Sequence, residues 1–518
     1  MDKNLKMIFN YHNRTKHYYA RYAKSIGFMD WANQPDPFRS YEEALHVELP
    51  LASNNSTPPY SSIFTDDLPS SLLSIDSISQ LFQFSLGISA IKSSGDSVWA
   101  LRCNASSGNL HPSEAYLILP PIDGISELST LSHYSPKDHS LEVLKSFNTD
   151  IWDNVQEGTF LFALSSIVYR EVWKYGERAF RYVMLDIGHA QRAVEISAKI
   201  LGWKVGLLKD IDDNSMCKIL GYNQIGRIEK KEHEIPEIFL QISPDKIKKT
   251  VNMDVISSNT KLPRANRLAP DYQDWELIDE IINATNSSIE TKLACENIVE
   301  YERHPTKNSK TVVLERRSAQ MMNKEDSKID YEQFITIMKS TKISFLGLQN
   351  VANLIIFVHN VDGLKQGLYL YARVNHTIGE LKKALKSDFI WEEIDDDLYL
   401  LNYGDYREIS KQISCSQSIA SDGVFSLGML CRFSDEISKY GEHRYKELFW
   451  ECGAIGQQLY IEATSLGLSA TGIGCFLDDA FHELLGLKTD TFQSLYHFTI
   501  GRAIVDKRVK DIVPYSVR

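Results

Sequence analysis

The motif Lys174-Tyr175-Gly176-Glu177 occurs twice in the chain, and its second copy is Lys439-Tyr440-Gly441-Glu442, 265 positions later. With that offset held and no gap, 12 of the 48 positions from 174 to 221 are identical to their counterparts at 439 to 486. Average residue usage would give roughly three identities by chance. The sequence is therefore a tandem duplication, and its two halves are expected to share one fold.

Each copy predicts the same succession of elements. Apolar residues at helical spacing follow the motif, and Gly202 and Gly467 are typical of the end of a helix. Strand-like apolar runs lie around these helices at 115–119, 160–164, 238–242, 354–358, 424–427 and 496–500. The interleaving of helices and strands predicts an α+β fold in which each half has a sheet covered by helices.

Polar and proline-containing stretches indicate where the halves begin and end. We expect an N-terminal extension over 1–48, a first domain over 49–243 and a second domain over 307–518. The stretch 244–306 between the domains is polar and predicts a connection with one helix, from Trp275 to Ala284.

Composition excludes several classes of function. The 518 residues carry a formal net charge of −12, which argues against a broad nucleic-acid footprint. No apolar run approaches the ~20 residues that span a bilayer, and the N-terminus has no apolar segment typical of a signal peptide. The seven cysteines are scattered and lack CxxC spacing, which favours reduced thiols over a disulfide framework or a metal site. We expect a cytoplasmic protein with no membrane or nucleic-acid partner and no bound metal.

Three segments could carry chemistry. Ser106-Ser107-Gly108-Asn109 is a small-residue loop that lets backbone amides approach a planar ligand. Arg316-Arg317-Ser318 pairs guanidinium groups with a hydroxyl, as phosphate sites do. Gly472-Ile473-Gly474 could expose amides at close range. Each segment also has a plain structural interpretation: a turn, a solvated helix start and a helix–strand connector.

Taken in this order, the segments resemble the nitroreductase superfamily, and specifically its SagB-type branch. That branch includes the FMN dehydrogenases that oxidise thiazolines and oxazolines in peptide natural products. Four further stretches carry the resemblance: Tyr11 to His17, Asp30 to Pro35, Gly363 to Tyr369, and Asp506 to Arg508. The resemblance implies two nitroreductase-like domains with mostly antiparallel sheets, which form an intramolecular pseudo-dimer.

The resemblance also implies an FMN site that both halves share. The cofactor-binding residues it indicates are Ser106, Ser107 and Asn109 from the first half, and Arg316, Arg317, Ser318, Gln320, Gln417, Gly472, Ile473, Gly474 and Arg508 from the second. Gln320 stands where the family usually has a basic residue, which would lower the flavin potential. The symmetry-related site lacks these motifs at 51–64, 206–210 and 341–348. We therefore expect one FMN per chain, and a monomer.

A Lys-Tyr pair is implicated in removing a proton from substrate in the azoline dehydrogenases. Both Lys174-Tyr175 and Lys439-Tyr440 are candidates here, and a desolvated lysine can act as a base. By analogy with homodimers, the half that supplies the Ser-Ser loop should supply the base, which favours Lys174 and Tyr175. The alternative is a structural helix start in which Glu177 and Arg181 form an ion pair.

The resemblance therefore implies an FMN-dependent oxidoreductase that acts on a small molecule or peptide, and the azoline-dehydrogenase type is the activity it favours. An NAD(P)H-dependent nitro- or quinone reductase is an alternative within the enzymes. A non-catalytic flavin-binding or partner-binding scaffold is an alternative of another class.

Overall fold

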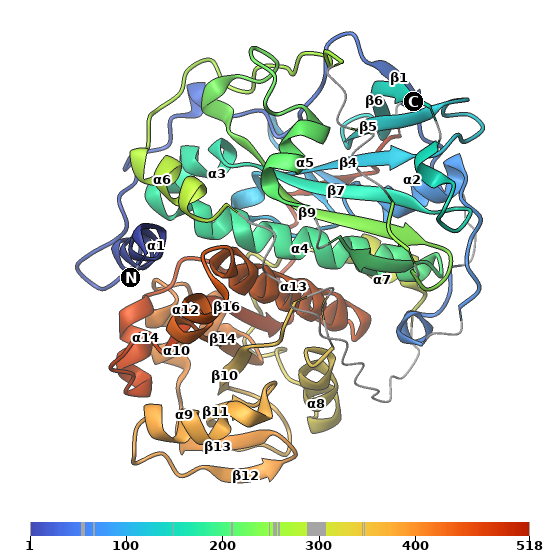
Figure 1. Ribbon diagram of the computed structural model, residues 1–518. Helices are drawn as coiled ribbons and strands as arrows, with labels where there is room; N and C mark the ends of the chain where they lie inside the picture. The colour runs from blue at the N-terminus through green and yellow to red at the C-terminus, as the bar shows by residue number, and fades with distance from the viewer. Residues whose placement is uncertain are drawn as a thin grey trace.

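The computed structural model describes residues 2–52, 57–65, 68–148, 150–208, 211–247, 249–251, 256, 260–286, 307–343, 345 and 348–516. Within them the chain forms two seven-stranded sheets and one three-stranded sheet. In Figure 1 the two large sheets lie on opposite sides of a central helical layer, with α4 and α13 between them. This layering predicts that the interface between the halves is also the core of the molecule.

The two large sheets are antiparallel throughout their described pairings. The first has the order β1-β6-β5-β4-β7-β9-β8, with β1 Leu45–Glu48, β4 Ser113–Leu119, β5 Ser129–Ser135, β6 Ser140–Phe147, β7 Phe160–Ile167, β8 Lys204–Leu207 and β9 Glu234–Ser243. The second has the order β12-β13-β11-β10-β14-β16-β15, with β10 Ala352–Val358, β11 Gly367–Tyr371, β12 Glu392–Asp395, β13 Leu398–Tyr403, β14 Phe425–Arg432, β15 Ser469–Ile473 and β16 Phe492–Gly501. The six strands predicted from apolar runs are all confirmed.

The helices complete the layers on both sides of the interface. They are α1 Lys3–Arg14, α2 Ile75–Gln83, α3 Tyr169–Tyr175, α4 Ala179–Ile200, α5 Asp213–Leu220, α6 Glu276–Ala284, α7 Ser309–Glu315, α8 Tyr331–Ser340, α9 Ile378–Ala384, α10 Arg407–Ile413, α11 Ile419–Asp422, α12 Ser434–Tyr440, α13 Arg444–Ser465 and α14 Asp478–Leu485. Helix α6 is the one predicted between the halves. No helix of the described chain is long and apolar enough to cross a membrane.

The duplication seen in the sequence is confirmed element by element. Helices α3, α4 and α5 begin and end 265 positions before α12, α13 and α14, and the first residue of β8 precedes that of β15 by the same interval. Six strands of each sheet also share one order, with β4, β7 and β9 equivalent to β10, β14 and β16, whereas the edge strands β1 and β12 come from different places in the two halves. The fold is thus two similar α+β halves joined in one chain.

Helices α4 and α13 cross at two glycines that are equivalent in the repeat. A Cβ on Gly188 would lie 2.1 Å from the Trp450 carbonyl oxygen, and one on Gly453 would lie 2.0 Å from that of Leu185. Nearly every residue of both helices is buried, and the largest apolar cluster contains residues of both halves. The small residues therefore allow the two backbones to approach within contact distance.

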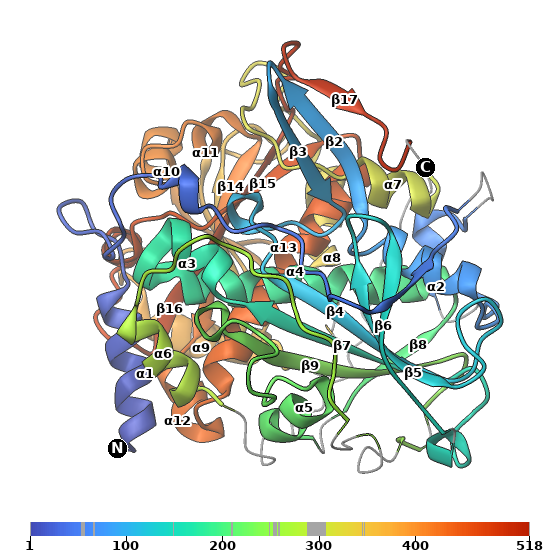
Figure 2. The ribbon, with the colours of Figure 1, turned by 90° about the horizontal axis from the view of Figure 1, so that it is seen from above.

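Both ends of the chain pack across the interface. Helix α1 contacts α6, and the backbone N–H of His17 donates to Asp478 in the second half. At the other end, β17 (Lys510–Ile512) pairs with β2 (Ile88–Ser94), which also pairs with β3 (Ser97–Arg102). Figure 2 shows this small sheet at one edge of the molecule. Strand β1, at the end of the predicted N-terminal extension, forms the edge of the first large sheet.

The interpretation in which Glu177 and Arg181 form an ion pair is wrong. Glu177 accepts two hydrogen bonds from Arg14, of 3.0 Å and 2.5 Å. Arg181 instead pairs with Asp478 at 2.8 Å, and Arg178 pairs with the same carboxylate at 2.8 Å. These partners are remote in sequence, and all three of Arg178, Arg181 and Asp478 are buried. The cluster therefore links the two halves instead of stabilising one helix.

Candidate functional site

The Ser106-to-Asn109 loop joins β3 to β4 in an unusual backbone conformation. Gly108, Asn109 and His111 have φ values of 58°, 60° and 50°. A left-handed conformation at a residue other than glycine costs of order 1 kcal/mol or more, and such residues cluster at functional sites. The Asn109 side chain stabilises the turn by donating to the Ala100 carbonyl at 2.9 Å and by a 2.9 Å hydrogen bond to His111.

Asp186 in α4 fixes the position of this loop. Its carboxylate accepts hydrogen bonds from the Ser107 backbone N–H at 3.0 Å and from the Ser107 hydroxyl at 2.9 Å. Asp186 is buried, and burial raises its pKa to about 7. The carboxyl therefore changes its protonation state near neutral pH while it holds the loop.

Helix α3 brings Lys174 and Tyr175 against the same loop. A Cβ on Gly108 would lie 2.6 Å from the Tyr175 hydroxyl and 3.0 Å from the Lys174 ammonium. A Cβ there would force these groups to shift, and the positive φ of Gly108 also favours glycine. Glu171, one turn earlier in α3, is buried, and neither of its carboxylate oxygens has a hydrogen-bond partner among the described residues. Burial raises the pKa of Glu171 well above its usual value.

The second half reaches this region through Arg316. Its guanidinium donates to the carbonyl of Cys103 at 2.7 Å and to that of Arg102 at 3.0 Å, just before the loop. Arg316 is 3% exposed, and its Nη1 has no hydrogen-bond partner among the described residues. Burial lowers its pKa to about 10. This arrangement leaves a buried cation with a free donor.

Tyr460 of α13 joins the arginine motif to the glycine segment. Its hydroxyl lies 2.8 Å from that of Ser318 and accepts from the Gly472 N–H at 2.8 Å. The Arg316 guanidinium lies over the Tyr460 ring at 5.0 Å. The segments at 316–318 and 472–474, predicted from separate parts of the sequence, are therefore adjacent.

Tyr182 completes the connection back to the first half. A Cβ on Gly474 would lie 2.1 Å from the Tyr182 ring, and this ring packs on that of Tyr175 with centroids 4.4 Å apart. A Cβ on Gly472 would lie 1.8 Å from the Tyr496 hydroxyl. Both glycines thus allow close approach of tyrosines, and the Gly472 amide is bonded to Tyr460. The expectation of an amide open to a ligand therefore does not hold for Gly472 in this conformation.

Other predicted site residues lie at the margin of this cluster. Arg317 donates to the Ser89 hydroxyl and carbonyl at 3.1 Å and 2.9 Å, and Gln320 is exposed. Gln417 donates to the Cys475 carbonyl at 3.2 Å, beside Gly474. Arg508 is 85% exposed and pairs with Asp506 at 2.7 Å. The structure therefore brings Gln417 to the glycine segment, whereas the contacts of Arg508 are with its own turn.

The symmetry-related position is filled by side chains. Of the predicted degenerate loop at 341–348, residues 344, 346 and 347 lie outside the described residues. Phe345 is fully buried there, with the guanidinium groups of Arg192 and Arg373 over its ring at 5.4 Å and 5.8 Å. Arg373 also pairs with Glu451 at 2.6 Å, and Glu451 is the repeat counterpart of Asp186. The two positions related by the duplication thus differ in chemistry.

Lys439 and Tyr440 differ from their counterparts in the same way. Lys439 is exposed, and its ammonium lies over the Tyr440 ring at 4.7 Å. Lys174 is half-buried and touches the loop of the first half. The structure therefore brings one Lys-Tyr pair to the cluster and leaves the other at the surface.

Sequence reasoning missed four residues of the cluster: Glu171, Tyr182, Asp186 and Tyr460. The alignment of the repeat pairs Asp186 with Glu451, so an acid at this position in both halves was a usable signal. For the other three, a tyrosine or glutamate in an amphipathic helix gives no local indication of what it faces.

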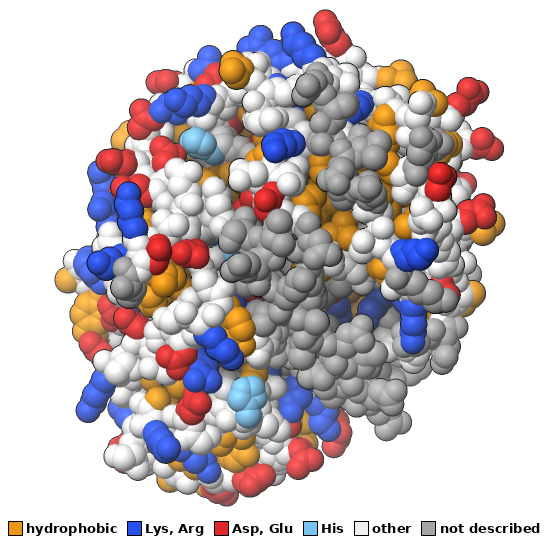
Figure 3. Space-filling model, in the orientation of Figure 1, with side chains coloured by type: hydrophobic (Ala, Val, Ile, Leu, Met, Phe, Trp, Pro, Cys, Tyr) orange, Lys and Arg blue, Asp and Glu red, His pale blue; other side chains and the backbone are white. Residues whose placement is uncertain are grey.

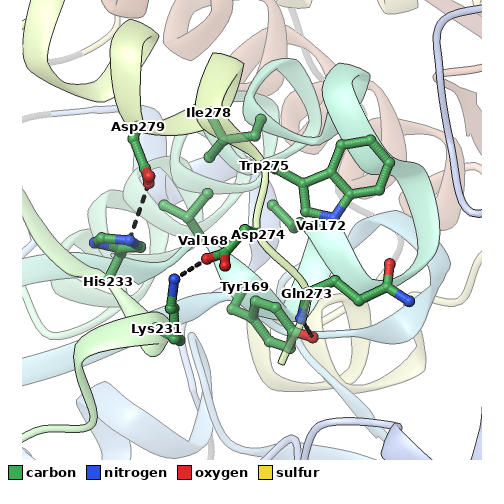
Figure 4. A pocket seen from close by; sticks show the side chains of 10 residues that line it. All are labelled: Val168, Tyr169, Val172, Lys231, His233, Gln273, Asp274, Trp275, Ile278 and Asp279. Carbon is green, nitrogen blue, oxygen red and sulfur yellow. Dashed lines mark hydrogen bonds and ion pairs between the residues drawn. The ribbon is translucent and has the colours of Figure 1, made fainter. Parts of the chain in front are cut away.

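A hollow lies elsewhere, beside α3 (Figure 4). It encloses about 300 Å³ and is lined by Val168, Tyr169, Val172, Lys231, His233, Gln273, Asp274, Trp275, Ile278 and Asp279. His233 pairs with Asp279 at 3.0 Å, and Lys231 pairs with Asp274. The charged side chains that line the hollow are thus paired with each other.

The described residues contain no group of three side chains placed to hold a metal ion. Figure 3 shows basic and acidic side chains interspersed over the face drawn.

Comparisons with known proteins agree with this fold. Residues 417–502 match the Nitroreductase family. The chain is 24% identical over 131 residues to a protein of Methanocaldococcus jannaschii provisionally named a nitroreductase; the match covers 25% of this chain and 56% of that protein. A crystal structure of a protein from Anabaena variabilis, also provisionally named a nitroreductase, superimposes with a TM-score of 0.71 at 21% identity and covers 96% of this chain and 99% of that one. The fold is therefore that of two tandem nitroreductase-like halves.

Proposed function

We propose that the chain binds one FMN between its halves and is a flavin-dependent oxidoreductase. The observation that carries this proposal is the contact of Arg316, from the second half, with the backbone that leads into the Ser106-to-Asn109 loop of the first. A buried guanidinium with a free Nη1 donor and no carboxylate partner among the described residues fits the phosphate of a nucleotide. The match of residues 417–502 to the Nitroreductase family supports the same cofactor class.

In this proposal Arg316, Arg317 and Ser318 hold the phosphate end of FMN. Ser106, Ser107 and Asn109, with Gly472 to Gly474 and Gln417, border the ring end, where Gln320 leaves the usual basic position neutral. Bound FMN supplies a two-electron acceptor that a side chain cannot provide. The protein binds and orients the cofactor and the substrate.

We propose further that substrate loses a proton to Lys174 during an azoline-type dehydrogenation. Lys174 and Tyr175 touch Gly108 at the tip of the loop, so a substrate beside the loop would meet the lysine Nζ. Glu171 is buried close enough to this ammonium for the lysine charge to oppose, in part, the rise in the pKa of Glu171 that burial causes. A peptide or a small molecule with an azoline ring is the substrate class that this chemistry fits.

Replacement of Arg316 tests the cofactor site. Charge-assisted hydrogen bonds contribute ~1.5–3 kcal/mol, so Arg316→Ala should raise the Kd for FMN by about tenfold to a hundredfold. Titration of the apoprotein, followed by quenching of flavin fluorescence, measures the change. Ser318→Ala is a milder substitution that serves if Arg316→Ala fails to fold, and it should weaken FMN binding several-fold.

Arg432 provides a matched control. It is a partly exposed arginine that pairs with Asp435 at 2.9 Å on the outer surface. Arg432→Ala should leave the affinity for FMN unchanged, and equal losses in both arginine variants would contradict the proposed site. If NAD(P)H rapidly reduces the flavin, seen as loss of its absorbance, and azoline peptides do not reduce it, a nitro- or quinone reductase is favoured instead.

A further inference from the structure

Two cysteines from distant parts of the chain meet next to Gly474. The Sγ atoms of Cys415 and Cys475 are 2.6 Å apart, which is closer than sulfur atoms in ordinary van der Waals contact and near the reach of a covalent bond. Both residues are partly exposed. The pair is therefore accessible to a small reagent, unlike the buried pair Cys431 and Cys452, whose sulfurs are 3.4 Å apart.

Several independent contacts hold the two cysteine segments together. The backbone N–H of Leu477 donates to the Ile413 carbonyl at 2.7 Å, and Gln417 donates to the Cys475 carbonyl. Cys415 and Ser416 have φ values of 53° and 60°. Two successive left-handed residues other than glycine are strained, and the Cys415 sulfur that meets Cys475 belongs to this turn.

The surroundings of Cys475 favour its thiolate. The hydrogen bond between the two sulfurs, followed by one with His17, lowers the pKa of Cys475 to about 5. Because His17 Nδ1 accepts from the Ala23 N–H at 3.0 Å, its Nε2 carries the proton and can donate to the sulfur. The positive charge of Arg178, whose Nη2 donates to the Gly474 carbonyl at 3.3 Å, acts in the same direction. Such a thiolate is the attacking species in disulfide exchange.

We propose that Cys415 and Cys475 form a redox-active dithiol that exchanges with low-molecular-weight disulfides such as oxidised glutathione. The Cys475 thiolate attacks one sulfur of the disulfide, whose S–S bond breaks, and the first glutathione leaves as a thiol after taking a proton from water. Cys415 then loses its proton and attacks the Cys475 sulfur, which releases the second glutathione. Two protein thiols are oxidised to one disulfide, and one glutathione disulfide is reduced to two thiols.

Peptide mapping of the full-length protein after equilibration with glutathione buffers tests this directly. As the fraction of oxidised glutathione rises, we expect a cross-linked Cys415–Cys475 peptide, while Cys431, Cys452 and Cys217 remain thiols that are alkylated after denaturation. Cys415→Ser should stop at a mixed disulfide of Cys475 with one glutathione, whereas Cys475→Ser should form no adduct at Cys415. Recovery of both cysteines as free thiols at every ratio would overturn the proposal.

Alkylation rates of the unaltered protein provide a second readout. At pH 6, iodoacetamide should modify Cys475 at least about tenfold faster than Cys217, a partly exposed thiol whose pKa burial raises to about 11. His17→Ala should slow the reaction of Cys475 several-fold and leave Cys217 unaffected. Equal rates at the two cysteines would refute an activated thiolate. Neither measurement depends on bound flavin, so their outcome is separate from that of the proposed oxidoreductase function.

Discussion

Lys174 and Lys439 occupy equivalent positions in the repeat, but their side chains have different neighbours. Lys174 lies against Gly108, and Lys439 is exposed beside Tyr440. Loss of a general base typically lowers the rate by ~10²–10⁴. We expect Lys174→Ala to reduce azoline oxidation by that factor with FMN retained, and Lys439→Ala to change it by less than about twofold. Single-turnover assays at equal flavin content measure the rates of both variants. Comparable rate losses in the two variants would exclude Lys174 as the base.

Asp186 gives a pH dependence that can be tested at the residue scale. Burial raises its pKa to about 7, whereas the unfolded value is ~3.9. The folded state therefore binds this proton more tightly, and the free energy of unfolding falls as pH rises from about 4 to about 7. Since one pKa unit corresponds to about 1.4 kcal/mol, the loss is at most ~4 kcal/mol.

Asp186→Asn removes this titration but keeps an acceptor for the Ser107 N–H. Urea unfolding of flavin-free protein across this pH range should show a smaller decline for the variant than for the unaltered chain. The difference between the two curves isolates Asp186 from the other titrating groups. Identical slopes would show that Asp186 does not change its protonation state there.

At the scale of elements, the α4–α13 crossing brings the backbones of the two halves into contact. A Cβ on Gly453 would lie 2.0 Å from the Leu185 carbonyl oxygen, and a rigid backbone atom cannot move aside cheaply. Overpacking of this kind costs ~1–3 kcal/mol or more. Gly453→Ala should lower the free energy of unfolding by at least about 2 kcal/mol, measured by chemical denaturation.

Gly379 in α9 is the matched control for this substitution. A Cβ there would meet no heavy atom within 4 Å, and the residue lies inside a helix. Gly379→Ala should stabilise the protein by about 0.5–1 kcal/mol, because alanine loses less backbone entropy than glycine in a helix. If both variants change the free energy of unfolding by a similar amount, the α4–α13 backbones are not in close contact at Gly453.

At the scale of the whole molecule, duplication followed by divergence has left one complete cluster. Arg316 meets the loop of the first half, whereas Phe345 and the Arg373–Glu451 pair fill the equivalent position on the other side. We expect purified protein to release about one FMN per chain on denaturation. Absorbance of the released flavin against protein concentration measures this ratio, and a value near two would contradict the single site. Arg316→Ala should lower it towards zero.

The sequence by itself determined the repeat and the elements within it. Helical spacing after each Lys-Tyr-Gly-Glu motif and apolar strand runs are local patterns, which predicted α4, α13 and six strands. The period of 265 residues relates α3, α4 and α5 to α12, α13 and α14 to the residue. The resemblance to nitroreductases indicated Arg316 and the Ser-Ser loop as members of one site. The structure brings Arg316 to the backbone just before that loop, although whether they bind FMN stays a prediction.

Only the tertiary structure decided which chemically similar groups meet. The sequence contains two Lys-Tyr pairs, and several arginines that could pair with any one carboxylate. Local spacing wrongly paired Glu177 with Arg181. The actual partners, Arg14 and Asp478, lie 163 and 297 positions away. The strand partners in β17 and β2, such as Lys510 and Ser93, are also remote in sequence. Such contacts depend on how the two halves pack around α4 and α13, and no local pattern records that packing.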